Sequence, residues 1–277
     1  MYISSTKTRT DALISINSTL RSRPVIMFIT RYQDVMDEVS KLKNKPDAEA
    51  EQLVILMCLF TLQFGKLVAD LIFEPMHQMR EILMDESRSV ALRQACANTL
   101  AIITTICCEE DEEPFANGMC CKMAWSSKPS KSSKTNENSG QLIATALTAW
   151  SLIILNADAK TIEEAESSQP KIVALLSHKD LEVRLAAART LAYLQEYMQE
   201  EAPEEFRGFP NEDHVLDLLR EMMKNEKKTS KKDRKEQRKG VREVLEYLKT
   251  GEDVAVEYVE NGSATLGLNS FRMKTTY

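Results

Sequence analysis

The chain has 277 residues, a net charge of −6 and only eight glycines. Its longest uninterrupted apolar run, Leu53 to Phe60, is eight residues long, short of the ~20 that a membrane-spanning helix needs. Residues 1–13 lack the apolar centre of a secretory signal. We therefore expect a cytoplasmic or nuclear protein with no membrane partner, in which the six cysteines are reduced. Abundant alanine, leucine, glutamate and lysine favour an all-α fold.

The first predicted helices show apolar residues at helical spacing. Leu13, Ile16 and Leu20 mark one helix. A second follows Pro24, with its apolar positions at Val25, Phe28, Ile29, Tyr32, Met36 and Val39. The apolar segment 50–64 predicts a third helix.

Two later segments form an internal repeat. Residues 89–101 and 180–192 align without gaps at an offset of 91, so that Arg93 falls on Arg184. A shorter helical pattern precedes each segment, and we expect Pro75 and Pro170 to occupy the first helical positions, where proline is well tolerated. Polar turns at 85–89 and 177–180 join the two helices of each pair, and Asp180 is placed as a helix N-cap.

The offset is about twice the ~40 to 47 residue period of HEAT and armadillo repeats. A further unit is therefore expected between the two segments, and residues 141–155 supply its long helix. Each helix pair has an apolar face that only a neighbouring pair can cover. The sequence thus predicts a HEAT/armadillo-like α-solenoid, with a helical-repeat domain over residues 1–223.

Residues 109–140 interrupt this pattern. They begin with an acidic run and end in a segment rich in serine and lysine, which predicts a mobile loop between repeats. Cys107-Cys108 and Cys120-Cys121 lack the CxxC spacing of a structural zinc site. Neither a catalytic triad nor a phosphate-binding glycine loop is visible. We expect no metal, no cofactor, no small-molecule substrate and no enzymatic activity.

The C-terminal part is predicted to contain an amphipathic helix and a small hairpin. A helix with apolar residues from Val215 to Met223 is followed by a basic amphipathic helix over 224–250. The apolar stripe expected to anchor that helix to the repeats is Val241, Val244, Leu245 and Leu248. Gly251 is the predicted stop of this helix, and alternation around Tyr258 with Asn261-Gly262 as a turn predicts a β-hairpin within 251–277.

Positive charge is concentrated at the start of the basic helix. Lys224 to Lys239 contains nine Lys or Arg and three acidic residues, a local charge of +6 that leaves −12 on the rest of the chain. The candidate RNA-binding residues are Lys231, Lys232, Arg234, Lys235, Arg238, Lys239 and Arg242. On a helix, Lys231, Lys235, Arg238 and Arg242 share one face. Such a row suits a nucleic-acid backbone, and the absence of aromatic residues predicts contact with phosphates rather than bases. A solvated, salt-bridged helix is the plainer alternative.

Four blocks of the chain resemble the interferon-related developmental regulator family. They are residues 7–39, 50–65, 147–194 and 231–258, and the basic block followed by Arg242-Glu243-Val244-Leu245 is the most specific. The resemblance implies a non-enzymatic regulator with a helical-repeat body. It also implies two activities: translational repression on ribosomes that are not working, and transcriptional co-regulation with corepressor and histone deacetylase complexes. Ribosome inhibition is linked to a distal C-terminal region of the family, so the resemblance implies docking more directly than blocking.

Two classes of function follow as hypotheses. The first is a helical-repeat adaptor that docks on a ribonucleoprotein, foremost the ribosome, through RNA phosphates. The second is a nuclear scaffold that binds transcriptional corepressor proteins and uses the basic run as an import signal. A third alternative is a chain that folds without an activity of its own.

Overall fold

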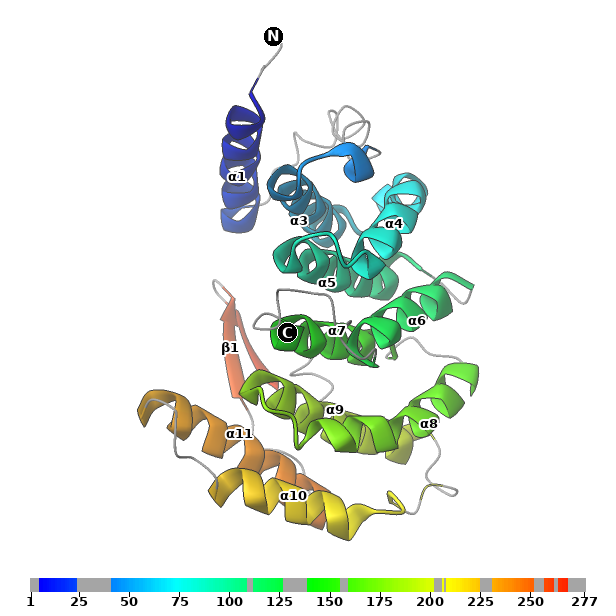
Figure 1. Cartoon of the computed structure of the whole chain (residues 1–277), viewed down its shortest axis with the longest axis vertical. Coiled ribbons are helices and arrows are strands. Elements are labelled where there is room, and N and C mark those ends of the chain that lie inside the picture. Colours follow the sequence, from blue (N-terminus) through cyan, green and yellow to red (C-terminus); the bar gives the residue numbers. More distant parts are fainter. Residues whose placement is uncertain are drawn as a thin grey trace. The chain divides into compact units, whose positions relative to one another are not determined.

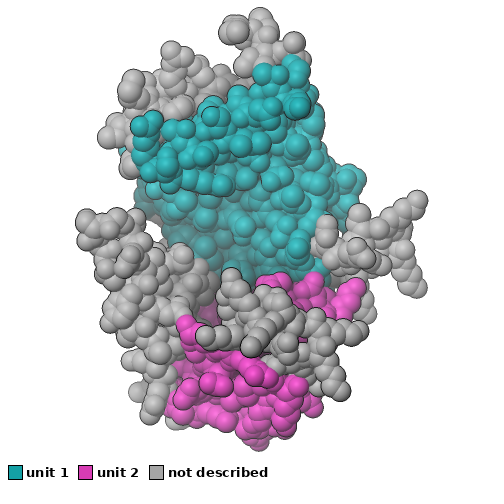
Figure 2. Space-filling view, turned by 90° about the vertical axis from the view of Figure 1, so that its left-hand side faces the viewer, with its two compact units in different colours: residues 1–157 teal, residues 158–277 magenta. Residues whose placement is uncertain are grey.

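The computed structural model describes residues 5–23, 41–108, 112–126, 139–154, 159–201, 206, 208–224, 231–251, 257–261 and 264–268. Over these residues the chain is helical apart from short connections and one two-stranded sheet (Figure 1). It divides into two compact units, residues 1–157 and 158–277 (Figure 2), a division that the sequence pattern did not predict. The fold class is all-α with helical repeats of the α-solenoid type, as predicted.

The first unit stacks its helices in two layers (Figure 1). One layer places consecutive helices side by side: α1 (Thr6–Ser22), α3 (Asp47–Phe64), α5 (Val90–Cys107) and α7 (Ser139–Ile154). The other contains α4 (Ala69–Met84) and α6 (Glu112–Ser126), and the short 3-10 helices η2 (Leu42–Asn44) and η3 (Gly65–Val68) flank α3. The predicted helix at 25–39 lies outside the described residues.

The second unit contains the remaining helices and the hairpin. Its helices are α8 (Ala159–Leu175), α9 (Leu181–Glu201), α10 (Glu212–Lys224) and α11 (Lys231–Thr250). Helix α9 contacts both α8 and α11, and α11 also contacts α10. The predicted hairpin is present as antiparallel strands β1 (Glu257–Asn261) and β2 (Ala264–Leu268), with Asn261 opposite Ala264.

The apolar helices of the first unit form its core. Two stretches, Asp47–Met84 and Val90–Cys107, are long and apolar enough to cross a membrane by length and composition alone. Core helices of globular proteins pass the same test, and here α4 and α3 both pack against α5. Phe60, Met79 and Leu100 are fully buried. We therefore assign both stretches to the helical core of this unit.

The repeated arginines have the same structural role in both units. Arg93 donates from Nε to the carbonyl of Leu83 at 2.8 Å, and Arg184 donates from Nη1 to the carbonyl of His178 at 2.8 Å. Each arginine thus binds backbone carbonyls at the end of the preceding helix or in its turn, groups that a helix leaves without internal partners. Asp180 accepts from the Glu182 N–H at 3.0 Å, in agreement with its predicted capping role.

The structure corrects two predictions about where helices lie. The prediction of a mobile loop over residues 109–140 is wrong for Glu112–Ser126, because these residues form α6. Residues 127–138 lie outside the described part of the chain. Cys121 and Trp125 are buried on α6, and Trp125 packs against Trp150 of α7 with ring centroids 5.5 Å apart. Burial of these few side chains outweighs the polar composition around them.

Both prolines lie inside helices rather than at their first positions. Helix α4 begins six residues before Pro75 and α8 eleven residues before Pro170. An interior proline removes one backbone hydrogen bond. Ile72 and Met76, on either side of Pro75, are buried, and their burial offsets that loss.

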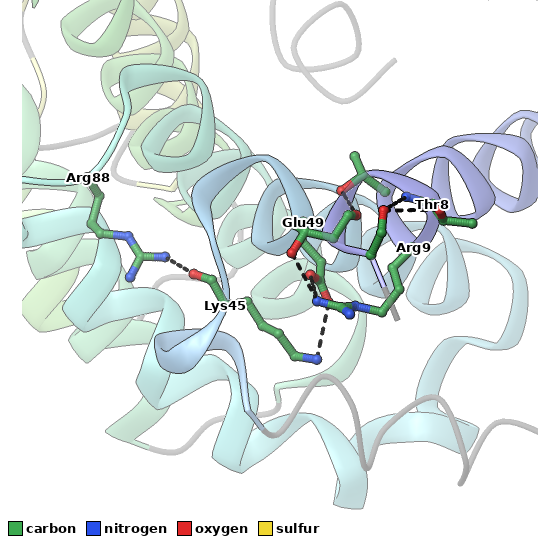
Figure 3. A network of polar contacts seen from close by, with 8 residues as sticks. Thr8, Arg9, Lys45, Glu49 and Arg88 are labelled. Carbon is green, nitrogen blue, oxygen red and sulfur yellow. Dashed lines mark hydrogen bonds and ion pairs between the residues drawn. The ribbon is translucent and has the colours of Figure 1, made fainter. Parts of the chain in front are cut away.

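A network of charged side chains joins α1 to α3 (Figure 3). Arg9 of α1 donates from Nε and Nη2 to the two carboxylate oxygens of Glu49, at 3.0 and 2.8 Å, and the Lys45 Nζ lies 3.1 Å from Glu49 Oε1. The Glu49 side chain is 2% exposed. Arg88 donates to the carbonyl of Lys45 at 3.2 Å. Because α1 buries few apolar residues, this network is a principal attachment of α1 to the stack.

Candidate nucleic-acid interface

Helix α11 contains the candidate RNA-binding residues and ends at a recognisable C-terminal stop. It has 20 residues, from Lys231 to Thr250, and is therefore about 30 Å long. Gly251 adopts a positive φ of 64° and donates its N–H to the carbonyl of Tyr247 at 2.9 Å. This is a glycine C-terminal stop, so the predicted end of the helix is confirmed.

One side of α11 is buried against α9 and α10. The residues of the predicted anchoring stripe have low exposure: Val241 1%, Val244 1%, Leu245 9% and Leu248 3%. Tyr247 joins them at 7%, and its hydroxyl lies 3.1 Å from Oε1 of Gln199 on α9. The C-terminal half of α11 is therefore fixed to the second unit by apolar packing and one polar contact.

The cations of α11 whose side chains are described lie outside this buried side. Arg238, Lys239 and Arg242 are exposed. The backbone of Lys231, Lys232, Arg234 and Lys235 is helical, whereas their side chains lie outside the described part. Lys239 is paired with Glu243, with Nζ 3.7 Å from Oε1. The helix thus combines a buried apolar side with an exposed basic side.

Arg189 of α9 is a neighbour of α11 that sequence reasoning missed. Its Nη2 lies 4.0 Å from the position that a Cβ would occupy at Gly240. No sequence signal could have placed it there, because the contact depends on how α9 packs against α11. Gly240 is on the opposite side of the helix from Arg238 and Arg242 by helical spacing, so Arg189 does not lie beside the basic row.

Three of the thiols, those of Cys58, Cys96 and Cys121, offer little nucleophilic or metal-binding chemistry. Burial raises the pKa of Cys58 to about 11, and it raises the pKa values of Cys96 and Cys121 further. Their thiolate forms, which would be the nucleophiles or ligands, are therefore suppressed near neutral pH. Among the described residues no group of three or more His, Cys, Asp or Glu could hold a metal ion. The histidines are separated: His77 within α4, His178 in a turn and His214 at the start of α10.

Comparison with known proteins identifies the family. A profile of the family described as "Interferon-related developmental regulator" matches residues 1–249, nearly the whole chain. The chain belongs to the interferon-related developmental regulator family. The family match includes the helices of both units and ends at the last turn of α11.

Individual members of the interferon-related developmental regulator family are distant relatives of this chain. "Interferon-related developmental regulator 1" of Rattus norvegicus is 24% identical over 99% of this chain and 62% of its own length. The proteins of the same name from Sus scrofa and Homo sapiens are each 25% identical over 69% of this chain and 45% of their own length. The chain thus spans about half to three fifths of the length of these family members.

Proposed function

We propose that this chain is a non-enzymatic helical-repeat adaptor that docks on a large ribonucleoprotein, foremost the ribosome, with α11 contacting RNA phosphates. Membership of a regulator family supports a regulatory role. The observation that favours RNA contact is the division of α11 into a buried apolar stripe and exposed cations. Neutralising phosphates releases condensed counterions, and this release favours binding without reference to base sequence.

The packing of α11 supports this proposal because it limits the entropic cost of binding. Val241, Val244 and Leu248 hold the helix against α9 and α10, so Arg242 projects from a backbone that is already ordered. Ordering a segment on binding costs part of the gross interaction energy. Cations on a preformed helix avoid the backbone part of this cost.

Neutralising the row tests the proposal. In the variant with Lys231, Lys235, Arg238 and Arg242 changed to Gln, we expect co-sedimentation with ribosomes to fall at least tenfold at about 150 mM salt, because the phosphate contacts are lost. A matched control removes four exposed cations elsewhere: Lys7, Arg21, Lys171 and Lys179.

The control variant has the same change in net charge and should retain co-sedimentation. Full binding by the α11 variant would contradict the RNA role. An equal loss in both variants would show that overall charge, rather than α11, determines binding.

The second candidate is a nuclear co-regulator that binds corepressor or histone deacetylase complexes. It is favoured by the same basic run, since short segments rich in Lys and Arg also act as nuclear import signals. Fusing residues 224–242 to a cytoplasmic reporter separates the two functions. Nuclear accumulation of the reporter would favour the co-regulator, and a reporter that stays in the cytoplasm would contradict the import signal.

A further inference from the structure

The row of cations on α11 continues past Arg242 to Lys249. Lys249 is exposed and lies in the last turn of the helix. It is seven residues beyond Arg242 and eighteen beyond Lys231. At 3.6 residues per turn, Lys249 is in phase with Lys231 and about 20° from Arg242 around the helix axis. Lys249 therefore extends the face that Lys231, Lys235, Arg238 and Arg242 occupy.

The two cations at this end of the row are not neutralised by neighbouring carboxylates. Over residues 238–251, where side chains are described, neither Arg242 nor Lys249 forms an ion pair. Glu246 is the acidic residue nearest to them in helical position, and it is exposed. The pair between Lys239 and Glu243 lies on a different flank of the helix. Arg242 and Lys249 can both present their charge to an external anion.

The backbone between these two cations is firmly packed against the rest of the second unit. Val244, Leu245, Tyr247 and Leu248 alternate with the exposed positions and are all buried. The separation of Arg242 and Lys249 along the axis is about 10.5 Å. Because this stretch cannot bend away without exposing its apolar side chains, the two cations keep a fixed spacing.

We infer that Lys249 is a further phosphate-binding residue, and that the RNA-binding row extends over about 27 Å from Lys231 to the last turn of α11. This inference rests on the proposed function. It adds a phosphate contact at Lys249, which lies outside the basic run from Lys224 to Lys239. Its ligand is the phosphate backbone of an RNA strand.

Lys249 also has a structural role that the test must separate from binding. A cation in the last turn of a helix interacts favourably with the helix dipole, by about 0.3 to 1 kcal/mol. That role alone predicts a lower stability for Lys249→Gln and an unchanged dependence of RNA affinity on salt. Phosphate contact predicts a change in the salt dependence itself.

The experiment measures the affinity of the full chain for a single-stranded RNA of mixed sequence between about 50 and 200 mM salt. Each phosphate contact contributes about 0.7 to the slope of log K against log salt for single strands. We expect Lys249→Gln to reduce the slope by about 0.7 and Lys249→Arg to restore it. The exposed Lys171 of α8 supplies the matched control, and Lys171→Gln should leave the slope unchanged. Glu246→Gln, which removes a repelling charge, should raise the affinity without lowering the slope.

The outcomes separate the inference from the function on which it rests. If Lys249→Gln keeps the wild-type slope while the variant neutralised at Lys231, Lys235, Arg238 and Arg242 loses RNA binding, Lys249 makes no phosphate contact and the inference is wrong. If the latter variant also binds RNA as the wild type does, the proposed RNA contact fails as well. An equal drop in slope for Lys171→Gln would overturn the assignment to α11.

Discussion

Glu49 is a carboxylate buried between a terminal helix and the stack, with two cations around it. The hydrogen bonds from Arg9 lower its pKa below the usual 4.5, and Lys45 lowers it further, although burial acts in the opposite direction. The unfolded chain therefore binds a proton at Glu49 at a higher pH than the folded chain does. Its stabilising contribution is complete above the ordinary pKa and is lost as the pH falls through the lowered folded value.

Glu49→Gln should therefore reduce the free energy of unfolding by about 2 kcal/mol at neutral pH, since hydrogen bonds to charged groups contribute about 1.5 to 3 kcal/mol. The difference between wild type and variant should shrink as the pH falls below 4.5. Urea denaturation at several pH values measures both effects. Glu51→Gln, on the same helix, is the matched control and should have little effect. A constant difference across the pH range would show that the carboxylate charge is not what stabilises the contact.

Single-residue patterns predicted the repeat but not its polar contacts. The alignment of Arg93 with Arg184 was visible in the sequence. The carbonyl groups that accept their hydrogen bonds depend on how the two helices of each pair pack against each other. The partner of Glu49 lies 40 residues away in the chain. Sequence spacing cannot bring Arg9 to it, because the register between α1 and α3 is set by tertiary packing.

At the scale of elements, helical periodicity predicted most helices, and it failed where few apolar residues support a helix. α6 was missed because an acidic run precedes it and a segment rich in serine and lysine follows it, and because the burial of Cys121 and Trp125 depends on neighbours in α5 and α7. For the candidate site, the period of 3.6 placed Val241, Val244, Leu245 and Leu248 correctly on one side. It did not indicate Tyr247, which lies about 60° around the helix axis from Val244, at the edge of the stripe, and is buried by contact with α9.

Gly240 lies inside α11. Its replacement tests whether the low helix propensity of this residue limits the free energy of unfolding. A glycine in a helix interior costs about 1 kcal/mol relative to alanine. The added Cβ would meet Arg189 Nη2 at 4.0 Å, an ordinary contact. Gly240→Ala should thus raise the free energy of unfolding by about 1 kcal/mol, measured by urea denaturation followed by circular dichroism.

Gly65→Ala is the contrasting control for this substitution. Space is also available at Gly65, where a Cβ would lie 3.9 Å from Ile106 Cγ2, but its φ is +54°. With its ψ of −135°, this is a backbone region that glycine alone adopts readily, and a residue with a Cβ held in such a region costs about 1 to 3 kcal/mol, so this variant should be destabilised. If Gly240→Ala were also destabilised, the approach of α9 to α11 would be tighter than the structure shows.

At the scale of the whole molecule, the division into two units can be followed with intrinsic probes. Both tryptophans, Trp125 and Trp150, lie in the first unit, whereas helices in both units contribute to circular dichroism. The repeated arginines provide one matched variant for each unit. Arg184→Ala removes hydrogen bonds in the second unit, and Arg93→Ala removes the corresponding bond in the first.

Each substitution should cost about 1.5 kcal/mol. In urea, Arg184→Ala is expected to lower the midpoint seen by circular dichroism while the fluorescence midpoint stays unchanged, and Arg93→Ala should lower the fluorescence midpoint. Equal shifts of both probes for Arg184→Ala would instead show that the two units unfold as one cooperative body.

Because α11 is packed through its apolar side, a ligand that binds this helix changes the thermal stability of the protein. Any polyanion that binds only the ordered helix must stabilise the folded second unit by mass action, by about 2.7 kcal/mol at a hundredfold excess over its dissociation constant. Partners can therefore be screened by the rise in melting temperature of the unlabelled chain. A partner that binds through its phosphate backbone will raise the melting temperature less as sodium chloride is added.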